Sequence, residues 1–239
     1  MLAPAVIEET SFQSAWIEAV EFLKQHQWKC HNLVVHVHDT QIFDKRIHDI
    51  VALFALNNNL RSPEQVASTI FPWKQYASSD SAEELYARYA RIYERSKKAR
   101  RGTWGTYFNR MTDYQASGNQ VNQLQSIIDA IRSRDKVHGS AYTIVIQHPG
   151  SETIRPLGGP CLNYLALQIV DRTQLGMLGV YRNHEFLERA YGNYWGLCRL
   201  IKFLAKEIGL SPGPLTCISS HAYVKDQKRN LVSLLEELG

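Results

Sequence analysis

Apolar residues recur at spacings of three and four along much of the chain, which is the period of an amphipathic helix. In residues 81–98, Leu85, Tyr89 and Ile92 follow this period, and Ser81 stands at the position of a helix cap. The same pattern predicts further helices from Thr10 or Ser11 through Trp16 to Phe22, over residues 45–57, from Ser62-Pro63-Glu64 onward, over residues 120–134, over residues 193–208 up to Gly209, and over residues 227–239.

Alternating apolar and polar residues predict strands over residues 32–39, 141–147, 165–170, 175–181 and 215–223. Residues 101–119 are rich in Gly, Thr, Asn and aromatic residues, so we expect a loop there. No internal repeat or Ser/Gly-rich linker divides the chain. Because strands and helices do not alternate strictly, the sequence predicts one α+β domain over residues 1–239, with a mixed sheet covered by helices.

The composition is that of a globular protein and excludes several other classes. The chain has 239 residues, of which 44% are hydrophobic and 21% charged, so it is long enough to bury a full core. Collagen-like, coiled-coil and disordered chains have other compositions. The net charge of +4 permits an anionic small molecule and does not require a nucleic-acid polymer.

The cysteines and the first residues indicate the compartment. The four cysteines contain no CxxC pair, which argues against a zinc ribbon or a disulfide scaffold. Glu8 and Glu9 stand where a secretory signal needs a basic head, and no apolar run approaches the roughly 20 residues of a membrane helix. We therefore expect a soluble cytoplasmic protein with reduced thiols and no membrane partner.

One cysteine lies in an unusual place. Cys161 follows Gly158-Gly159-Pro160 and directly precedes a predicted strand, where a side chain can lie at the floor of a cleft. A free thiol has a pKa near 8.5, and Arg182, at the end of a following strand, could supply the cation that lowers it. Taken alone, Cys161 is better explained as a small buried hydrophobe.

Other polar residues gather after apolar segments. Tyr181-Arg182-Asn183-His184-Glu185 follows a strand, which is typical of a binding edge or of a solvated turn. Asn193 begins the most apolar predicted helix, and its amide could bind the edge of a heterocycle or simply cap the helix. His221 and Tyr223 share one strand face, where both could donate to a hydroxyl.

Two further features give little support for a metal site or a phosphate-binding site. His36 and His38 share a strand face, but no third ligand has suitable spacing, so we expect no metal site. The basic run over residues 95–101 could meet a phosphate, but a helix end is the better explanation.

In order along the chain, Gly159-Pro160-Cys161, Tyr181 to Glu185 with Asn193, and Ser220-His221-Ala222-Tyr223 resemble the thymidylate synthase family. The resemblance covers residues 158–224, extends more loosely over residues 102–147, and is closest to the compact archaeal members. It implies a thymidylate synthase-like sheet whose back face pairs with a second copy in a homodimer. It also implies one-carbon transfer, either methylation or hydroxymethylation, to C5 of a uracil-type pyrimidine nucleotide or nucleoside.

The resemblance assigns roles to the polar residues. Cys161 would add to C6 of the pyrimidine as a thiolate, and Arg182 would lower its pKa and contact substrate. Asn193 would bind the N3–C4 edge of the base, where an amide suits uracil and an aspartate marks the cytosine hydroxymethylases. His221 and Tyr223 would bind the ribose hydroxyl. Asn183, which replaces the family's serine, would also lie at the substrate.

The cofactor implied is 5,10-methylenetetrahydrofolate or a related reduced pterin. Glu185 takes the place of an aspartate that contacts the folate ring, and Trp104 would lie beside it. Tyr107, or Trp104, would orient water or the proton-transfer network near C5. Asp49 is the candidate for the family's catalytic glutamate.

The sequence departs from the family around the substrate phosphate. The paired arginines expected just before Tyr142 are here His138-Gly139-Ser140, and the histidine after the nucleophile is Leu162. A nucleoside, a modified nucleotide or a larger conjugate therefore fits better than a plain 5′-monophosphate, unless residues 95–101 compensate. Two other functions stay open: a nucleotide-binding regulatory protein without catalysis, and a specialised enzyme that applies the same thiolate addition to another ring.

Overall fold

The computed structural model describes residues 4–96, 104–116, 118–133, 138–139, 141–149 and 158–239. The strands are β1 (Ala5–Glu9), β2 (Lys29–Val37), β3 (Tyr114–Ala116), β4 (Asn119–Val121), β5 (Tyr142–Val145), β6 (Leu162–Val170), β7 (Gln174–Tyr181), β8 (His184–Glu185) and β9 (Ser211–Tyr223). The helices are α1 (Phe12–Gln25), α2 (Lys45–Asn57), α3 (Pro63–Ile70), α4 (Trp73–Tyr76), α5 (Ala82–Ser96), α6 (Tyr107–Thr112), α7 (Gln123–Arg132), α8 (Tyr191–Ile208) and α9 (Lys228–Leu238), with one π-helical turn, η1 (Phe186–Ala190).

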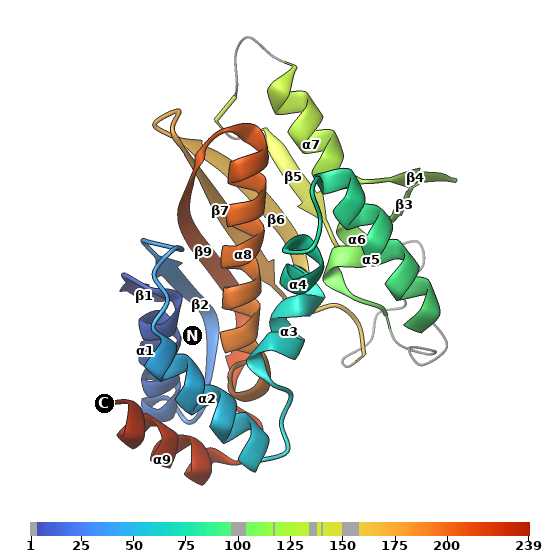
Figure 1. The fold of residues 1–239 in the computed structure, drawn as a ribbon. Coiled ribbons are helices and arrows are strands. Elements are labelled where there is room, and N and C mark those ends of the chain that lie inside the picture. The colour runs from blue at the N-terminus through green and yellow to red at the C-terminus, as the bar shows by residue number, and fades with distance from the viewer. Residues whose placement is uncertain (1–3, 97–103, 117, 134–137, 140, 150–157) are drawn as a thin grey trace.

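A mixed sheet forms the centre of the molecule (Figure 1). Its order in the described part of the chain is β1-β2-β9-β7-β6-β5, with β8 pairing with β9. β1 is parallel to β2 and β7 is parallel to β9, whereas the other pairs on this path are antiparallel. The prediction of an α+β fold with a mixed sheet covered by helices is confirmed.

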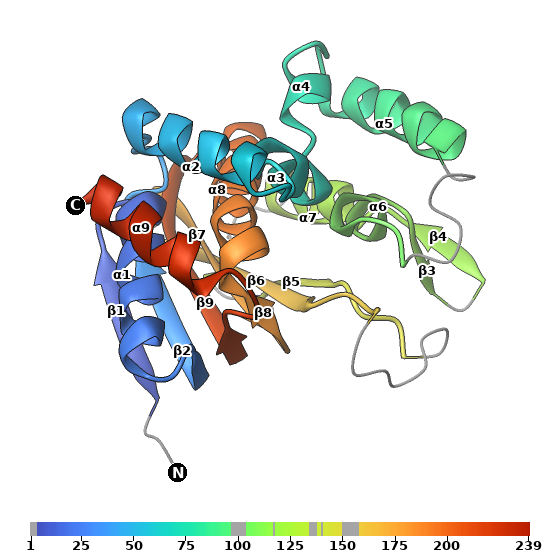
Figure 2. The same cartoon turned by 90° about the horizontal axis from the view of Figure 1, so that it is seen from below.

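The helices gather on one face of this sheet, and no described helix covers the other face (Figure 2). Along β7 and β9, residues pointing toward α8 are buried, while the alternate residues Leu178, Val180, Thr216 and Ile218 stay partly exposed. α8 lies at the centre of the covered face and carries the longest run of buried residues. The core therefore lies between α8 and the sheet.

Most predicted elements occur where the hydrophobic period placed them. Ser11 caps α1, and Ser62 caps α3, each in a capping box with the residue three positions later. Gly209 ends α8 in the left-handed conformation, with φ of 73°, that favours glycine at a helix end.

The prediction of a loop over residues 101–119 is wrong for its described part. It contains α6, which Thr106 caps, and the hairpin of β3 and β4. β1, β8 and α4 were also not predicted, because each has five residues or fewer and carries too little periodicity. Most of the basic run over residues 95–101 lies outside the described residues.

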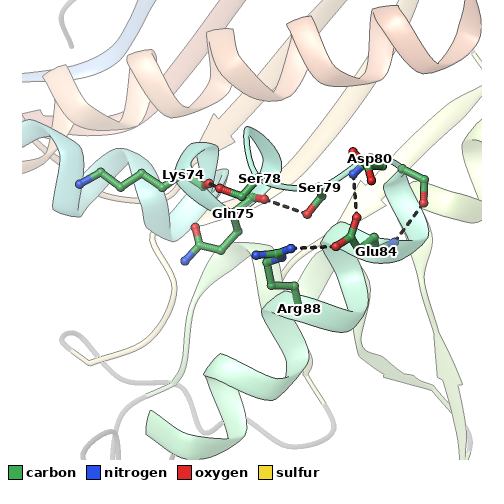
Figure 3. Close-up of polar contacts among 8 residues, drawn as sticks. Lys74, Gln75, Ser78, Ser79, Asp80, Glu84 and Arg88 are labelled. Carbon is green, nitrogen blue, oxygen red and sulfur yellow. Dashed lines mark hydrogen bonds and ion pairs between the residues drawn. The ribbon is translucent and has the colours of Figure 1, made fainter.

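Side-chain hydrogen bonds fix the turn between α4 and α5 (Figure 3). Glu84 accepts from the Asp80 backbone N–H at 2.7 Å and from the Arg88 guanidinium at 2.7 Å. Ser78 and Ser79 donate to the last carbonyls of α4. A cavity of about 400 Å³ lies between α3, α4 and α5 and reaches Thr106, the cap of α6.

No helix in the described ranges has the length and apolar character needed to cross a membrane.

Candidate active site

Cys161 directly precedes β6, at the end of the sheet where β6 begins and where β7 and β9 end. Its carbonyl accepts the Arg182 backbone N–H at 2.9 Å, which joins the start of β6 to the end of β7. The Tyr107 hydroxyl accepts the N–H groups of Cys161 at 3.3 Å and of Leu162 at 3.4 Å. The backbone of Cys161 is thus held from two sides, and its side chain is partly exposed.

Two effects act on the Cys161 thiol in opposite directions. Burial raises its pKa, while the guanidinium groups of Arg182 and Arg189 lower it, and burial is the larger effect. The Arg182 side chain is fixed by its Nε, which donates to the Pro160 carbonyl at 3.0 Å. Arg182 therefore acts in the expected direction, but the net pKa is raised, so the thiol is mostly protonated at neutral pH.

Tyr107 stands on α6, whose position depends on Thr106. The Thr106 hydroxyl caps α6 and hydrogen-bonds Tyr89 at 2.5 Å. Burial raises the pKa of Tyr107 to about 12, so its phenol is neutral and its O–H can still donate. Trp104 packs on Tyr107 with ring centroids 4.6 Å apart and remains partly exposed.

Asn193 belongs to a buried chain of hydrogen bonds beneath the N-terminal part of α8. Its Nδ2 lies 3.1 Å from His184 Nε2, and His184 Nδ1 lies 3.0 Å from the Ser219 hydroxyl. Exposure is 4% for Asn193, 1% for His184 and 0% for Ser219. Asn193 is not a helix cap, because it is the third residue of α8 and the π-helical turn η1 runs directly into that helix.

His221 and Tyr223 share one face of β9, as predicted, with stacked rings 5.1 Å apart. Asn183 Oδ1 lies 2.8 Å from His221 Nδ1. An amide oxygen only accepts, so His221 Nδ1 carries the hydrogen, and since burial lowers the His221 pKa the ring is neutral with Nε2 as an acceptor. His221 is therefore set to accept from a hydroxyl, whereas the sequence predicted donation. His31 of β2 lies beside it, with centroids 5.1 Å apart.

Glu185 caps the π-helical turn. Its Oε1 accepts from Leu187 N–H at 3.1 Å and Lys225 N–H at 3.5 Å, and its Oε2 accepts from Glu188 N–H at 2.6 Å. Burial raises its pKa, against these backbone donors. Each carboxylate oxygen can accept two hydrogen bonds, so Oε2 keeps one position for a ligand.

Asp49 lies apart from this group. It is exposed on α2 and forms an ion pair with Lys45. The structure brings together the other residues predicted for the site at one end of the sheet and does not bring Asp49 to them. His138 and Gly139, in place of the expected arginines, precede β5 at the far edge of the sheet.

The described residues contain no cluster of three or more side chains suited to hold a metal ion. His36 instead hydrogen-bonds Thr216 through Nδ1 at 2.8 Å. None of the four cysteines forms a disulfide.

Sequence reasoning missed three residues of the site: Arg189, His184 and Ser219. Arg189 lies among several charged residues in a segment without helical or strand periodicity, so no pattern in the sequence distinguishes it. His184 and Ser219 meet only because β8 and β9 pair in parallel, with His184 opposite Ala222. The one available signal was the position of His184 between Arg182 and Asn193.

Three curated archaeal proteins carry the name "Putative thymidylate synthase" and are similar to this chain. The protein from Methanococcoides burtonii is 26% identical over 121 residues, 51% of this chain and 52% of its own length. Those from Methanosarcina mazei and Methanosarcina barkeri are 24% and 23% identical, each over 53% of this chain and 55% of its own length. The chain thus spans about half the length of the relatives it matches. No protein-family model matches the chain.

Proposed function

We propose that this protein transfers a one-carbon unit to C5 of a uracil-type pyrimidine through covalent catalysis by Cys161. The observation that carries this proposal is the meeting of a partly exposed thiol, two guanidinium groups and a neutral phenol at one end of the sheet, with Asn193 at the start of the neighbouring helix. The names of the distant archaeal relatives support the same class of reaction.

Cys161 is the nucleophile of this proposal. Its thiolate attacks C6, forming an S–C6 bond, while the electrons of the C5–C6 double bond move to C5 and O4. C5 would then bond to the one-carbon unit of its donor and lose its hydrogen as a proton, and the donor's carrier nitrogen would leave with the electrons of its bond to that unit. Addition of hydride or water to the one-carbon unit would return an electron pair to C5, which expels the Cys161 thiolate and re-forms the C5–C6 double bond. Because burial keeps the resting thiol protonated, the proton must leave Cys161 when substrate arrives, and Arg182 and Arg189 stabilise the resulting charge.

The remaining residues position the substrate and move protons. The neutral Tyr107 hydroxyl, fixed beside the Cys161 backbone, can donate to water near C5. His221 and Tyr223 would contact the ribose, with His221 accepting from a hydroxyl, and Asn183 holds His221 in that tautomer.

A reduced folate or related pterin fits the residues at this end of the sheet. Trp104 offers a partly exposed aromatic face beside Tyr107, and Glu185 keeps a free acceptor position on Oε2. These two residues would hold the flat ring system, and the group supplies the one-carbon unit when bound. The product would be methylated if hydride is added to that unit and hydroxymethylated if water is added.

The uncovered face of the sheet supports a homodimer. Partly exposed apolar residues lie next to one another across three strands, since Leu178 is opposite Ala166 on β6 and Val180 is opposite Ile218 on β9. A second copy would bury this surface, and we propose that it does so.

The test is release of tritium from C5-labelled uridine, deoxyuridine, cytidine and their 5′-monophosphates in the presence of methylenetetrahydrofolate. The Cys161→Ser variant should lower the rate by at least about a thousandfold, because the hydroxyl is a far weaker nucleophile. Cys30→Ala is the matched control, since Cys30 is buried in β2 and should leave the rate unchanged. Absence of release from every compound would overturn the proposal and favour a binding protein or another ring substrate.

A further inference from the structure

We propose that His184 fixes the side-chain amide of Asn193 in the one orientation that recognises the N3–H and O4 edge of a uracil-type base, and that it is therefore the positioning residue for base selectivity. This inference rests on the proposed function, because it takes the pyrimidine site at Cys161 as its starting point. It concerns a buried chain of three side chains, Asn193, His184 and Ser219.

The geometry leaves His184 little freedom. Its ring stacks on Tyr181 with centroids 3.9 Å apart and planes within 3° of parallel, and Tyr194 meets it edge-on at 5.5 Å. Its two nitrogens face different partners, Ser219 at 3.0 Å and Asn193 at 3.1 Å. Since Ser219 lies opposite Tyr181 in the pairing of β7 with β9, the sheet itself sets the position of the ring.

The hydrogens in this chain follow from which groups can donate. Burial lowers the pKa of His184 to about 3, so the ring is neutral and carries one N–H. In the amide orientation of this structure, Asn193 Nδ2 faces His184 Nε2 and donates to it, so the ring hydrogen lies on Nδ1, where it donates to the Ser219 hydroxyl. The reverse amide orientation would place Oδ1 against the lone pair of Nε2, unless the ring hydrogen moved to Nε2 and the Ser219 hydroxyl donated to Nδ1 instead.

The fixed amide determines what a ligand must offer. Among the described residues, the side chain of Asn193 forms its one hydrogen bond through Nδ2 to His184, which leaves Oδ1 and the second Nδ2 hydrogen for a ligand. The pair therefore presents one acceptor and one donor, which match the N3–H donor and the O4 acceptor of uracil. Cytosine has an acceptor at N3 and a donor at N4, so both contacts would be mismatched unless the amide turned over and the hydrogens along the whole chain of Asn193, His184 and Ser219 were rearranged with it.

The experiment measures the ratio of dissociation constants for deoxycytidine and deoxyuridine, and for their 5′-monophosphates, by isothermal titration calorimetry. The native protein should prefer the uracil compound by at least about tenfold. His184→Leu removes the acceptor that holds the amide, so the ratio should fall below about threefold. His184→Gln, which can again accept from Asn193 Nδ2, should restore most of the preference. Tyr194→Phe keeps the ring that meets His184 and removes a buried hydroxyl that makes no hydrogen bond with the described residues, so it should leave the ratio unchanged.

The outcomes separate the two proposals. If neither base binds the native protein, the proposed function fails and this inference fails with it. If the native protein prefers uracil but folded His184→Leu keeps the full preference, only the role of His184 is overturned. Thermal melting shows which variants are folded, and if His184→Leu does not fold, Ser219→Ala decides the question. That variant removes the acceptor of Nδ1–H and must lower the ratio if the chain sets the selectivity.

Discussion

Burial raises the pKa of the Cys161 thiol, while the positive charges of Arg182 and Arg189 lower it. The net effect on the pKa predicts how the reactivity of the thiol changes with pH. Because burial raises its pKa, alkylation by iodoacetamide should be slow at neutral pH and should rise about tenfold per pH unit until the pKa is reached. Arg182→Gln removes a charge that favours the thiolate, so the pKa should rise further and the rate should fall at every pH below it. Mass spectrometry of the Cys161 peptide measures the rate.

A matched charge far from the thiol provides the control for this experiment. Arg132 pairs with Glu207 at 2.9 Å on the surface beside α7, so Arg132→Gln should leave the pH profile unchanged. Arg189→Gln should shift the profile in the same direction as Arg182→Gln, since it acts on the same thiol. An unchanged profile in Arg182→Gln would mean that the guanidinium does not stabilise the thiolate.

At the scale of single residues, the sequence could predict only those site residues whose role follows from their position relative to neighbouring strands. Cys161 and Arg182 stand at the start and end of neighbouring strands, and each was identified from its position along the chain. The hydrogen bond between His184 and Asn193 could not be predicted, because it depends on the parallel pairing of β8 with β9 and on the depth at which α8 packs. The net rise in the Cys161 pKa likewise depends on burial, which no local pattern gives.

At the scale of elements, close packing between α3 and α8 places the N-terminal part of α8, and with it Asn193. A Cβ at Gly192 would lie 2.6 Å from Val66 Cβ and 2.9 Å from the Pro63 carbonyl. Gly192→Ala should therefore destabilise the protein by roughly 1–3 kcal/mol, even though alanine is the better helix former. Urea unfolding followed by circular dichroism measures this difference.

Gly139→Ala is the control for this packing prediction. Among the described residues, its added Cβ would meet only the Ile169 carbonyl, at the ordinary distance of 3.6 Å, so the stability of the variant should stay within about 0.5 kcal/mol of the native protein. If Gly192→Ala were equally neutral, α3 could move away from α8 at no cost, and the packing would not position the site.

Long periodic elements were predictable and short ones were not. α1, α2, α7 and α8 bury one face over ten residues or more, so their period is visible in the sequence. The hairpin of β3 and β4 has strands of three residues, and α6 has six, so their conformation is set by caps and neighbours. For this reason the prediction of a loop is wrong in the segment that carries Tyr107.

At the scale of the whole molecule, the sheet has one face packed against helices and one face without a described cover. An antiparallel or mixed sheet can leave one face to solvent, but that face is then normally polar. Here Leu178, Val180 and Ile218 keep apolar side chains on it and stay partly exposed. A surface of this kind is typical of a contact between subunits.

Leu178→Glu tests that contact. A carboxylate at the centre of a buried apolar interface has no partner, so the dimer dissociation constant should rise by at least about a hundredfold. Sedimentation velocity should show the native protein as a dimer and the variant as a folded monomer at the same concentration. Leu56→Glu is the control, because Leu56 is 73% exposed on α2, on the helical side, and should leave the dimer intact. A native protein that sediments as a monomer would mean that something other than a second copy covers this face, or that it stays open to solvent.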